Sequence, residues 1–267
     1  MIFQYRDALL SYGGLMTIGI TIIIFILINI ILALIMIIKG IKTKYYTMVL
    51  IAAIFFAGIS AWGGVLFNFF YIIITDTFPS WIFKAFFMLQ GGALFIFHFI
   101  WIAGVSKLTS ITKKNRIILL VIVGIICAAM EGSWWYIVTT NIGIFGATSF
   151  PFIVTYSPIS YAYLTGSLMF FTVAGSWIVI ESFKSDDRKV KLKSKFLMVY
   201  VILITFGSLL EIFDPIENIL ENFYGFGALD AAVIASYTAK ILLTIGVICG
   251  YIGFMLPKPI EKLFLKT

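Results

Sequence analysis

Four polar side chains within the long apolar stretches of this chain are the candidates for chemistry. They are Gln90, Glu131, Glu211 and Lys240. An ionisable side chain inside a membrane-spanning helix costs about 2.5–3.5 kcal/mol on insertion scales, so it needs a partner or a function. Two carboxylates, an amide and an ammonium group could form a ligand or ion pocket, or an ion pair that only fixes helix packing. The residue types leave both interpretations open.

No catalytic or metal-binding motif accompanies these four residues. The sequence lacks a Gly-x-Ser-x-Gly elbow, a phosphate-binding loop and an Asp-rich metal motif. His98 is the only histidine, which excludes two-histidine haem sites and His-Glu-x-x-His zinc sites. We expect His98 to be packed, neutral and hydrogen-bonded, and Cys127 and Cys249 to be small apolar helix residues. The sequence thus predicts neither catalytic residues nor a metal site, and a protein that is not an enzyme.

The composition indicates that these side chains belong to a membrane protein. Hydrophobic residues make up 62% of the 267 residues and charged residues 12%, and the mean hydropathy is +1.10. Soluble domains contain about 25% charged residues. Because an ordinary water-exposed surface needs more polar side chains than this, we expect a multi-pass protein of the cell membrane.

Seven apolar runs follow one another along the chain. They are 14–38, 47–74, 81–105, 117–139, 160–183, 196–221 and 229–256. Each is long enough to cross the bilayer as a helix, which takes about 20 residues, and a helix satisfies its own backbone polar groups in lipid. The sequence therefore predicts an all-α bundle of seven transmembrane helices, forming one membrane domain over 1–267. Glycines such as Gly63 and Gly64, and Pro215, make the second and sixth runs the least regular.

The basic residues predict the orientation of the bundle. Sixteen of the 19 Lys and Arg residues lie at the first, third and fifth connections and in the C-terminal tail. Short connections rich in Lys and Arg stay on the cytoplasmic side. We expect the N-terminus outside and the C-terminus in the cytoplasm. The net charge of +7 then reflects this orientation and contact with anionic lipid headgroups, with no nucleic-acid partner.

Helical rise places the four candidate residues at a similar height. At 1.5 Å per residue, each lies about 22–25 Å from the cytoplasmic end of its helix. Glu211 and Lys240 lie on the sixth and seventh runs, which are sequential and therefore expected to be neighbours. We predict a Glu211–Lys240 ion pair, and a polar pocket in the outer half of the bilayer that also includes Gln90 and Glu131.

Further acidic residues follow Glu211 along the chain. Asp214 and Glu217 continue its helix face at spacings of three residues, and Asp230 begins the last run. These carboxylates could form an acidic vestibule that attracts cations. They could equally be solvated groups at a frayed helix end, and Asp230 could be a first-turn charge that the helix dipole favours.

Aromatic residues mark the outer end of the fourth run. Trp134 and Trp135 are typical of the belt of aromatic side chains at a membrane interface. The uncharged connection that follows them is about 20 residues long. It could fold over an outward-facing pocket as a lid, or lie in the headgroup region.

Three stretches carry a resemblance to a wider class of membrane proteins. They are KNRIILL and DRKVKLKSKFLMVY, which open the fourth and sixth runs, and the ending GYIGFMLPKPIEKLF. With the seven-helix layout, they resemble the seven-helix sensor regions of prokaryotes, some of which are fused to histidine kinases, and related uncharacterised archaeal proteins. This resemblance implies a sensor that passes its signal to a partner membrane or cytoplasmic signalling protein.

A lysine in the middle of the seventh run, within SYTAKILLTIG, also resembles the retinal-binding rhodopsins. That resemblance implies retinal bound to Lys240. Ser236, however, stands where microbial rhodopsins have an aspartate, and the sixth run lacks their Trp-x-x-Tyr-Pro pattern. We therefore expect no cofactor, with retinal on Lys240 as the lesser alternative.

Two functions remain in competition. The first is a receptor-like or sensor-like bundle that binds a small cationic or amphipathic ligand in the polar pocket. The second is a secondary transporter, in which the buried carboxylates would bind a proton or a coupling ion. An accessory subunit acting through partner helices is a third alternative.

Overall fold

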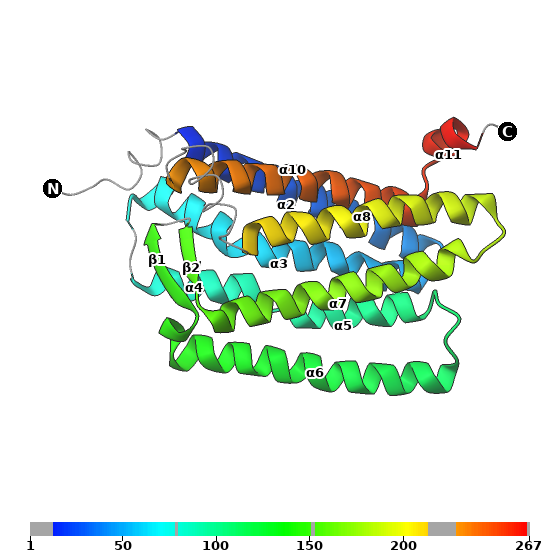
Figure 1. Cartoon of the computed structure of the whole chain (residues 1–267), viewed down its shortest axis with the longest axis horizontal. Helices are drawn as coiled ribbons and strands as arrows, with labels where there is room; N and C mark the ends of the chain where they lie inside the picture. Colours follow the sequence, from blue (N-terminus) through cyan, green and yellow to red (C-terminus); the bar gives the residue numbers. More distant parts are fainter. Residues whose placement is uncertain (1–12, 78–79, 151–152, 213–227, 266–267) are drawn as a thin grey trace.

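The chain forms a bundle of long helices, and the computed structural model describes residues 13–77, 80–150, 153–212 and 228–265 of it (Figure 1). Seven helical spans within this part are long and apolar enough to cross a membrane, as the sequence predicts. The helices are α2 (Gly13–Lys42), α3 (Tyr46–Thr75), α4 (Ser80–Gly91), α5 (Leu94–Ser106), α6 (Lys113–Thr140), α7 (Pro158–Phe183), α8 (Arg188–Ile212), α10 (Ala228–Met255) and α11 (Lys258–Phe264).

Polar residues at the connections begin several of the helices. The Thr112 hydroxyl accepts a hydrogen bond from the Asn115 backbone N–H at 3.3 Å, and Ser157 does the same for Ser160 at 3.3 Å. Such side chains satisfy N–H groups that lack a partner within the helix. At the start of α8 the Asp187 carboxylate accepts from the Lys189 N–H at 2.7 Å.

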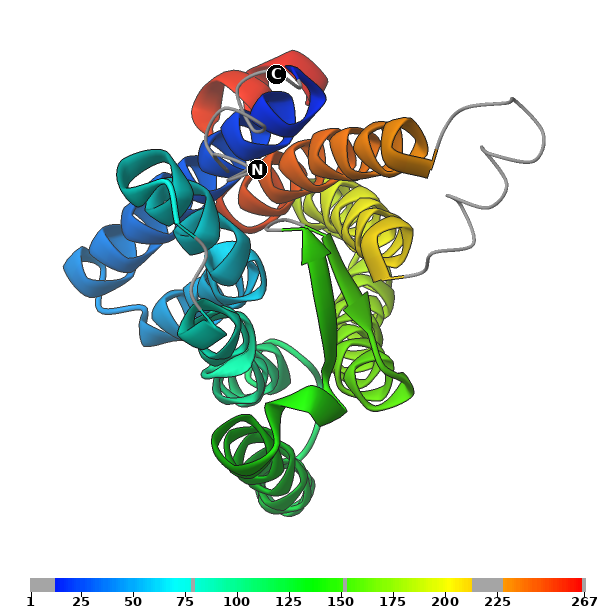
Figure 2. The same ribbon diagram turned by 90° about the vertical axis from the view of Figure 1, so that its left-hand side faces the viewer.

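The helices run nearly along one axis (Figure 1), and α6 lies at one edge of the bundle (Figure 2). Helix α8 packs along α10, and α2 packs against both α3 and α10. Phe55 and Trp101 are completely or almost completely buried, whereas Ile125 and Val173 are each 66% exposed. Apolar side chains on both the inner and outer faces are what a helix needs when its outer face meets lipid.

The third span is divided between two helices, whereas the sequence predicted that the second and sixth runs would be the least regular. Helix α4 ends at Gly91 and α5 begins at Leu94, whereas α3 runs without interruption through Gly63 and Gly64. A Cβ atom on Gly64 would lie 2.5 Å from the Phe86 carbonyl oxygen, so this glycine permits close packing of α3 on α4. Pro215 of the sixth run lies outside the described residues.

The connection between α6 and α7 forms a short β-hairpin, which adds a small sheet to the predicted helical fold. It consists of the 3-10 turn η1 (Ile142–Ile144), β1 (Gly146–Phe150) and β2 (Ile153–Tyr156), and the two strands pair antiparallel. The hairpin crosses one end of the bundle (Figure 2). Phe145, which precedes β1, is buried against Phe87 and Trp134, with ring centroids 5.3 and 4.4 Å away. This side chain anchors the connection to α4 and α6.

Candidate functional site

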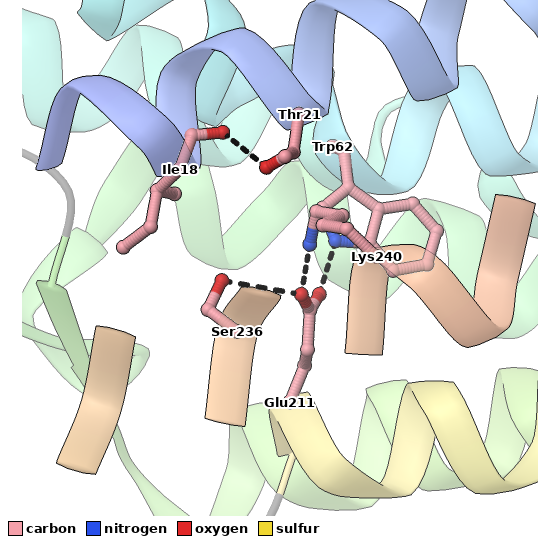
Figure 3. A network of polar contacts seen from close by, with 6 residues as sticks. All are labelled: Ile18, Thr21, Trp62, Glu211, Ser236 and Lys240. Atoms are coloured by element: carbon pink, nitrogen blue, oxygen red, sulfur yellow. Dashed lines mark hydrogen bonds and ion pairs between the residues drawn. The ribbon is translucent and has the colours of Figure 1, made fainter. Parts of the chain in front are cut away.

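The predicted ion pair between Glu211 and Lys240 is present, and it lies where α8 meets α10 (Figure 3). The Lys240 side chain is 2% exposed and the Glu211 side chain 16% exposed. Glu211 belongs to the last turn of α8, whereas Lys240 lies in the middle of α10. A pair this deeply buried interacts more strongly than one at a water-exposed surface.

Trp62 of α3 contacts both members of the pair. Its indole N–H donates a hydrogen bond to Oε2 of Glu211, and its ring centroid lies 4.9 Å from Nζ of Lys240. Ser236, one turn before Lys240, donates its hydroxyl to Oε1 of Glu211 at 3.5 Å. We refer to Trp62, Glu211, Ser236 and Lys240 as the Glu211 cluster (Figure 3).

Close helix packing positions the Glu211 cluster. A Cβ atom on Gly207 would lie 2.9 Å from Cγ of Leu243, so this glycine lets α8 approach α10 one turn before Glu211. Trp62 is held in turn by the edge of the Phe25 ring on α2, with centroids 5.1 Å apart. Side chains of α3, α8 and α10 thus form the cluster, and α2 packs behind it.

The arrangement has the chemistry of a cation site. A carboxylate neutralises an ammonium group, and the face of an indole attracts a cation within about 6 Å of its centroid. In this chain the cation is Lys240 itself, held by Glu211 and Trp62. The same two groups could hold the amine of a ligand if the lysine moved away.

Glu131 lies in a different place from the Glu211 cluster and has a different set of partners. Its Oε2 accepts a hydrogen bond from the Phe95 backbone N–H at 3.2 Å, and its Oε1 accepts from Nε1 of Trp135 at 3.1 Å. Phe95 is in the first turn of α5, where backbone N–H groups have no partner within the helix. Glu131 therefore caps α5 from the neighbouring helix α6.

Two tryptophans complete the polar contacts at the interruption of the third span. Trp134 Nε1 donates to the Phe87 carbonyl oxygen at 3.1 Å, and Trp135 Nε1 donates to that of Gly92 at 3.2 Å. Trp134 is 1% exposed, so it is a buried residue and not the interface-belt residue that the sequence suggested. Glu131, Trp134 and Trp135 share one face of α6. Glu131 and Trp135 satisfy backbone groups beside the interruption, and Trp134 gives the Phe87 carbonyl of α4 a hydrogen bond from outside its helix.

The structure does not gather the four predicted residues into one pocket. Gln90 is in the last turn of α4, beside the interruption, and its backbone carbonyl oxygen lies 3.4 Å from the Ser60 hydroxyl of α3, whereas Glu211 and Lys240 lie on α8 and α10. Helix α6 packs on α4 and α5, on the far side of the bundle from α10 (Figure 2). Equal height along the helices could be inferred from the sequence, but the position of each helix around the bundle could not. Asp214, Glu217 and the side chain of Asp230 lie outside the described residues.

His98 is buried and hydrogen-bonded, as predicted. Its Nδ1 lies 2.6 Å from the Leu94 carbonyl oxygen and its Nε2 lies 3.3 Å from the Ser167 hydroxyl. A carbonyl oxygen only accepts, so Nδ1 carries the proton and, in the neutral ring, Nε2 accepts from Ser167. The histidine thus links α5 to α7.

Trp62 is the residue of the cluster that the sequence did not indicate. It lies in an apolar run that offers no reason to single it out, and its contacts are made only after α3 packs on α8 and α10. No protein-family model matches the chain, and no curated protein or solved structure was found to be similar to it.

Proposed function

We propose that this chain is a receptor-like membrane protein whose Glu211 cluster binds a small cationic or amphipathic ligand. The observation that carries the proposal is the Lys240 ammonium between the Glu211 carboxylate and the Trp62 indole. These two groups would serve an external amine equally well. Lys240 then acts as a tethered cation that occupies the site until a ligand displaces it.

Displacement of Lys240 would provide the signal. The Glu211–Lys240 pair joins the end of α8 to α10, so its exchange for a Glu211–ligand pair releases a link between two packed helices. A ligand can shift a conformational equilibrium only as far as its affinities for the two states differ. With the N-terminus outside, as the lysine distribution favours, the cluster would be open to ligands from the outer side.

Choline is a suitable probe because 3,3-dimethylbutan-1-ol is its uncharged carbon analogue. The full chain would be placed in nanodiscs of phosphatidylglycerol and phosphatidylethanolamine, and binding would be measured by equilibrium dialysis. We expect saturable binding of choline and none of the alcohol. Removing the internal competitor in Lys240→Met should tighten choline binding, and Glu211→Gln should abolish it.

The outcomes of this experiment separate the alternatives. Equal binding of choline and the alcohol, or binding that survives Glu211→Gln, would show that the cluster is not a cation site. A folded Lys240→Met protein that binds choline while the wild type does not would leave the pair with only a structural role.

The interruption between α4 and α5 supports a second candidate, a proton- or ion-coupled transporter. Discontinuous membrane helices with a buried acidic group at a half-helix end often form transport sites. Here the Glu131 carboxylate meets the first turn of α5. Uptake of choline into proteoliposomes under a pH gradient, lost in Glu131→Gln, would favour the transporter over the receptor.

A further inference from the structure

A basic pocket lies at the end of the bundle opposite the β-hairpin. It has a volume of about 560 Å³ and is lined by the first three turns of α8, the end of α7 and the C-terminal helix α11. Arg188, Lys191 and Lys195 all line it, and they recur on one face of α8. We call it the basic groove.

The positive charges of the three basic residues in the groove are not neutralised by any acidic side chain that the structure describes. None of them makes an ion pair or a side-chain hydrogen bond with any residue that the structure describes. Their neighbours differ, because Lys184 pairs with Glu181 and Lys189 with Glu261, each at 2.8 Å. Like charges three and four residues apart on a helix repel one another, so an anion between them would be stabilising.

The rest of the groove is apolar. Leu192, Phe196 and Phe264 line it, and the rings of the last two meet edge to face with centroids 5.8 Å apart. The Lys189–Glu261 ion pair holds α11 beside α8, which keeps Phe264 at the groove. A positively charged mouth and an apolar wall thus occur together at the end of membrane-spanning helices, where headgroups meet hydrocarbon.

We propose that the basic groove binds an anionic phospholipid. Its phosphate would lie between Arg188, Lys191 and Lys195, and its acyl chain would follow the apolar wall formed by Leu192, Phe196 and Phe264. Charge complementarity selects the anionic headgroup, and the wall selects a lipid over a free phosphate. This site is separate from the Glu211 cluster and does not depend on the proposed function.

Native mass spectrometry of the full chain in detergent tests this proposal. The protein would be titrated with phosphatidylglycerol or with phosphatidylcholine of the same acyl chains, and the bound lipids would be counted. We expect one phosphatidylglycerol adduct that forms about tenfold more tightly than the phosphatidylcholine adduct. The triple variant Arg188→Gln/Lys191→Gln/Lys195→Gln should lose this preference.

A matched control variant removes three positive charges from the same end of the bundle, the same number as the groove variant. Lys113, Lys114 and Arg116 at the start of α6 lie outside the groove, so their triple glutamine variant should keep the preference. Equal loss in both triple variants would mean diffuse surface attraction and would overturn the proposal. So would full binding to the groove variant.

Two further arms test the apolar wall. Phe264→Ser should weaken the phosphatidylglycerol adduct, because the side chain is 56% exposed and is free to contact an acyl chain. Glycerol 3-phosphate carries the phosphate without acyl chains, and an excess of it should leave the adduct in place. Displacement by this soluble phosphate would identify a free phosphate site and contradict the lipid assignment.

Discussion

At the scale of single residues, the effect of Lys240 on the stability of the fold depends on the presence of Glu211, and the effect of Glu211 depends on Lys240. Breaking a buried ion pair from one side leaves an uncompensated charge, whereas replacing both partners removes the charge altogether. The pair could be predicted because its residues sit at one height on sequential helices. Trp62 could not, because it contacts Glu211 from a helix that is distant in sequence, and the capping role of Glu131 could not, because it depends on the break between α4 and α5.

The first prediction concerns this pair. Glu211→Gln or Lys240→Met alone should lower the free energy of unfolding by about 3–5 kcal/mol, and the double variant should recover most of the loss. Unfolding in SDS, followed by circular dichroism, measures these differences. Lys184 is the control, since its side chain is 64% exposed in the pair with Glu181 and Lys184→Gln should therefore have a much smaller effect. Losses that simply add in the double variant would mean that the two residues are not coupled.

At the scale of elements, the broken third span shows the limit of apolar runs as predictors. The run 81–105 is continuous in hydropathy, so it predicted one unbroken helix where the structure has α4 and α5. Helix α6 stabilises the interruption, because Glu131 and Trp135 bind the Phe95 N–H and the Gly92 carbonyl oxygen beside it and Trp134 binds the Phe87 carbonyl of α4. Their spacing places them on one helix face, but it does not indicate what that face meets.

The second prediction tests this packing with two alanine substitutions. A Cβ atom on Gly91 would lie 1.9 Å from Cε2 of the Trp134 ring, so Gly91→Ala must displace this tryptophan, which packs on the end of α4 beside the interruption. We expect a loss of about 1–3 kcal/mol in the free energy of unfolding, as for other overpacked sites. Gly132→Ala is the control, because a Cβ atom there has nothing within 4 Å. Equal effects of the two substitutions would contradict the proposed contact.

At the scale of the whole molecule, the asymmetric charge distribution bears on both orientation and partners. The seven spans followed directly from run length and hydropathy, and the structure has them. The basic groove required the structure, since α11 meets α8 only in the folded chain. Together, the two proposals describe a bundle that binds a cation near one end and an anionic lipid at the other.

The third prediction concerns orientation. Single cysteines introduced at Thr43, between α2 and α3, and at Gly143, in η1, should fall on opposite sides of the membrane. A membrane-impermeant maleimide applied to intact cells should label Gly143→Cys and leave Thr43→Cys unlabelled until the cells are lysed. The reverse pattern would place the N-terminus in the cytoplasm.

The most direct test of the central claim measures whether a ligand displaces Lys240 from Glu211. Brief treatment of the protein in nanodiscs with acetic anhydride, followed by mass spectrometry of its peptides, reports how accessible each lysine is. We predict that Lys240 is protected in the free protein because it is buried. Its acetylation should rise severalfold with choline but not with 3,3-dimethylbutan-1-ol, while the exposed Lys258 stays unchanged. Acetylation of Lys240 that choline does not alter would contradict the account.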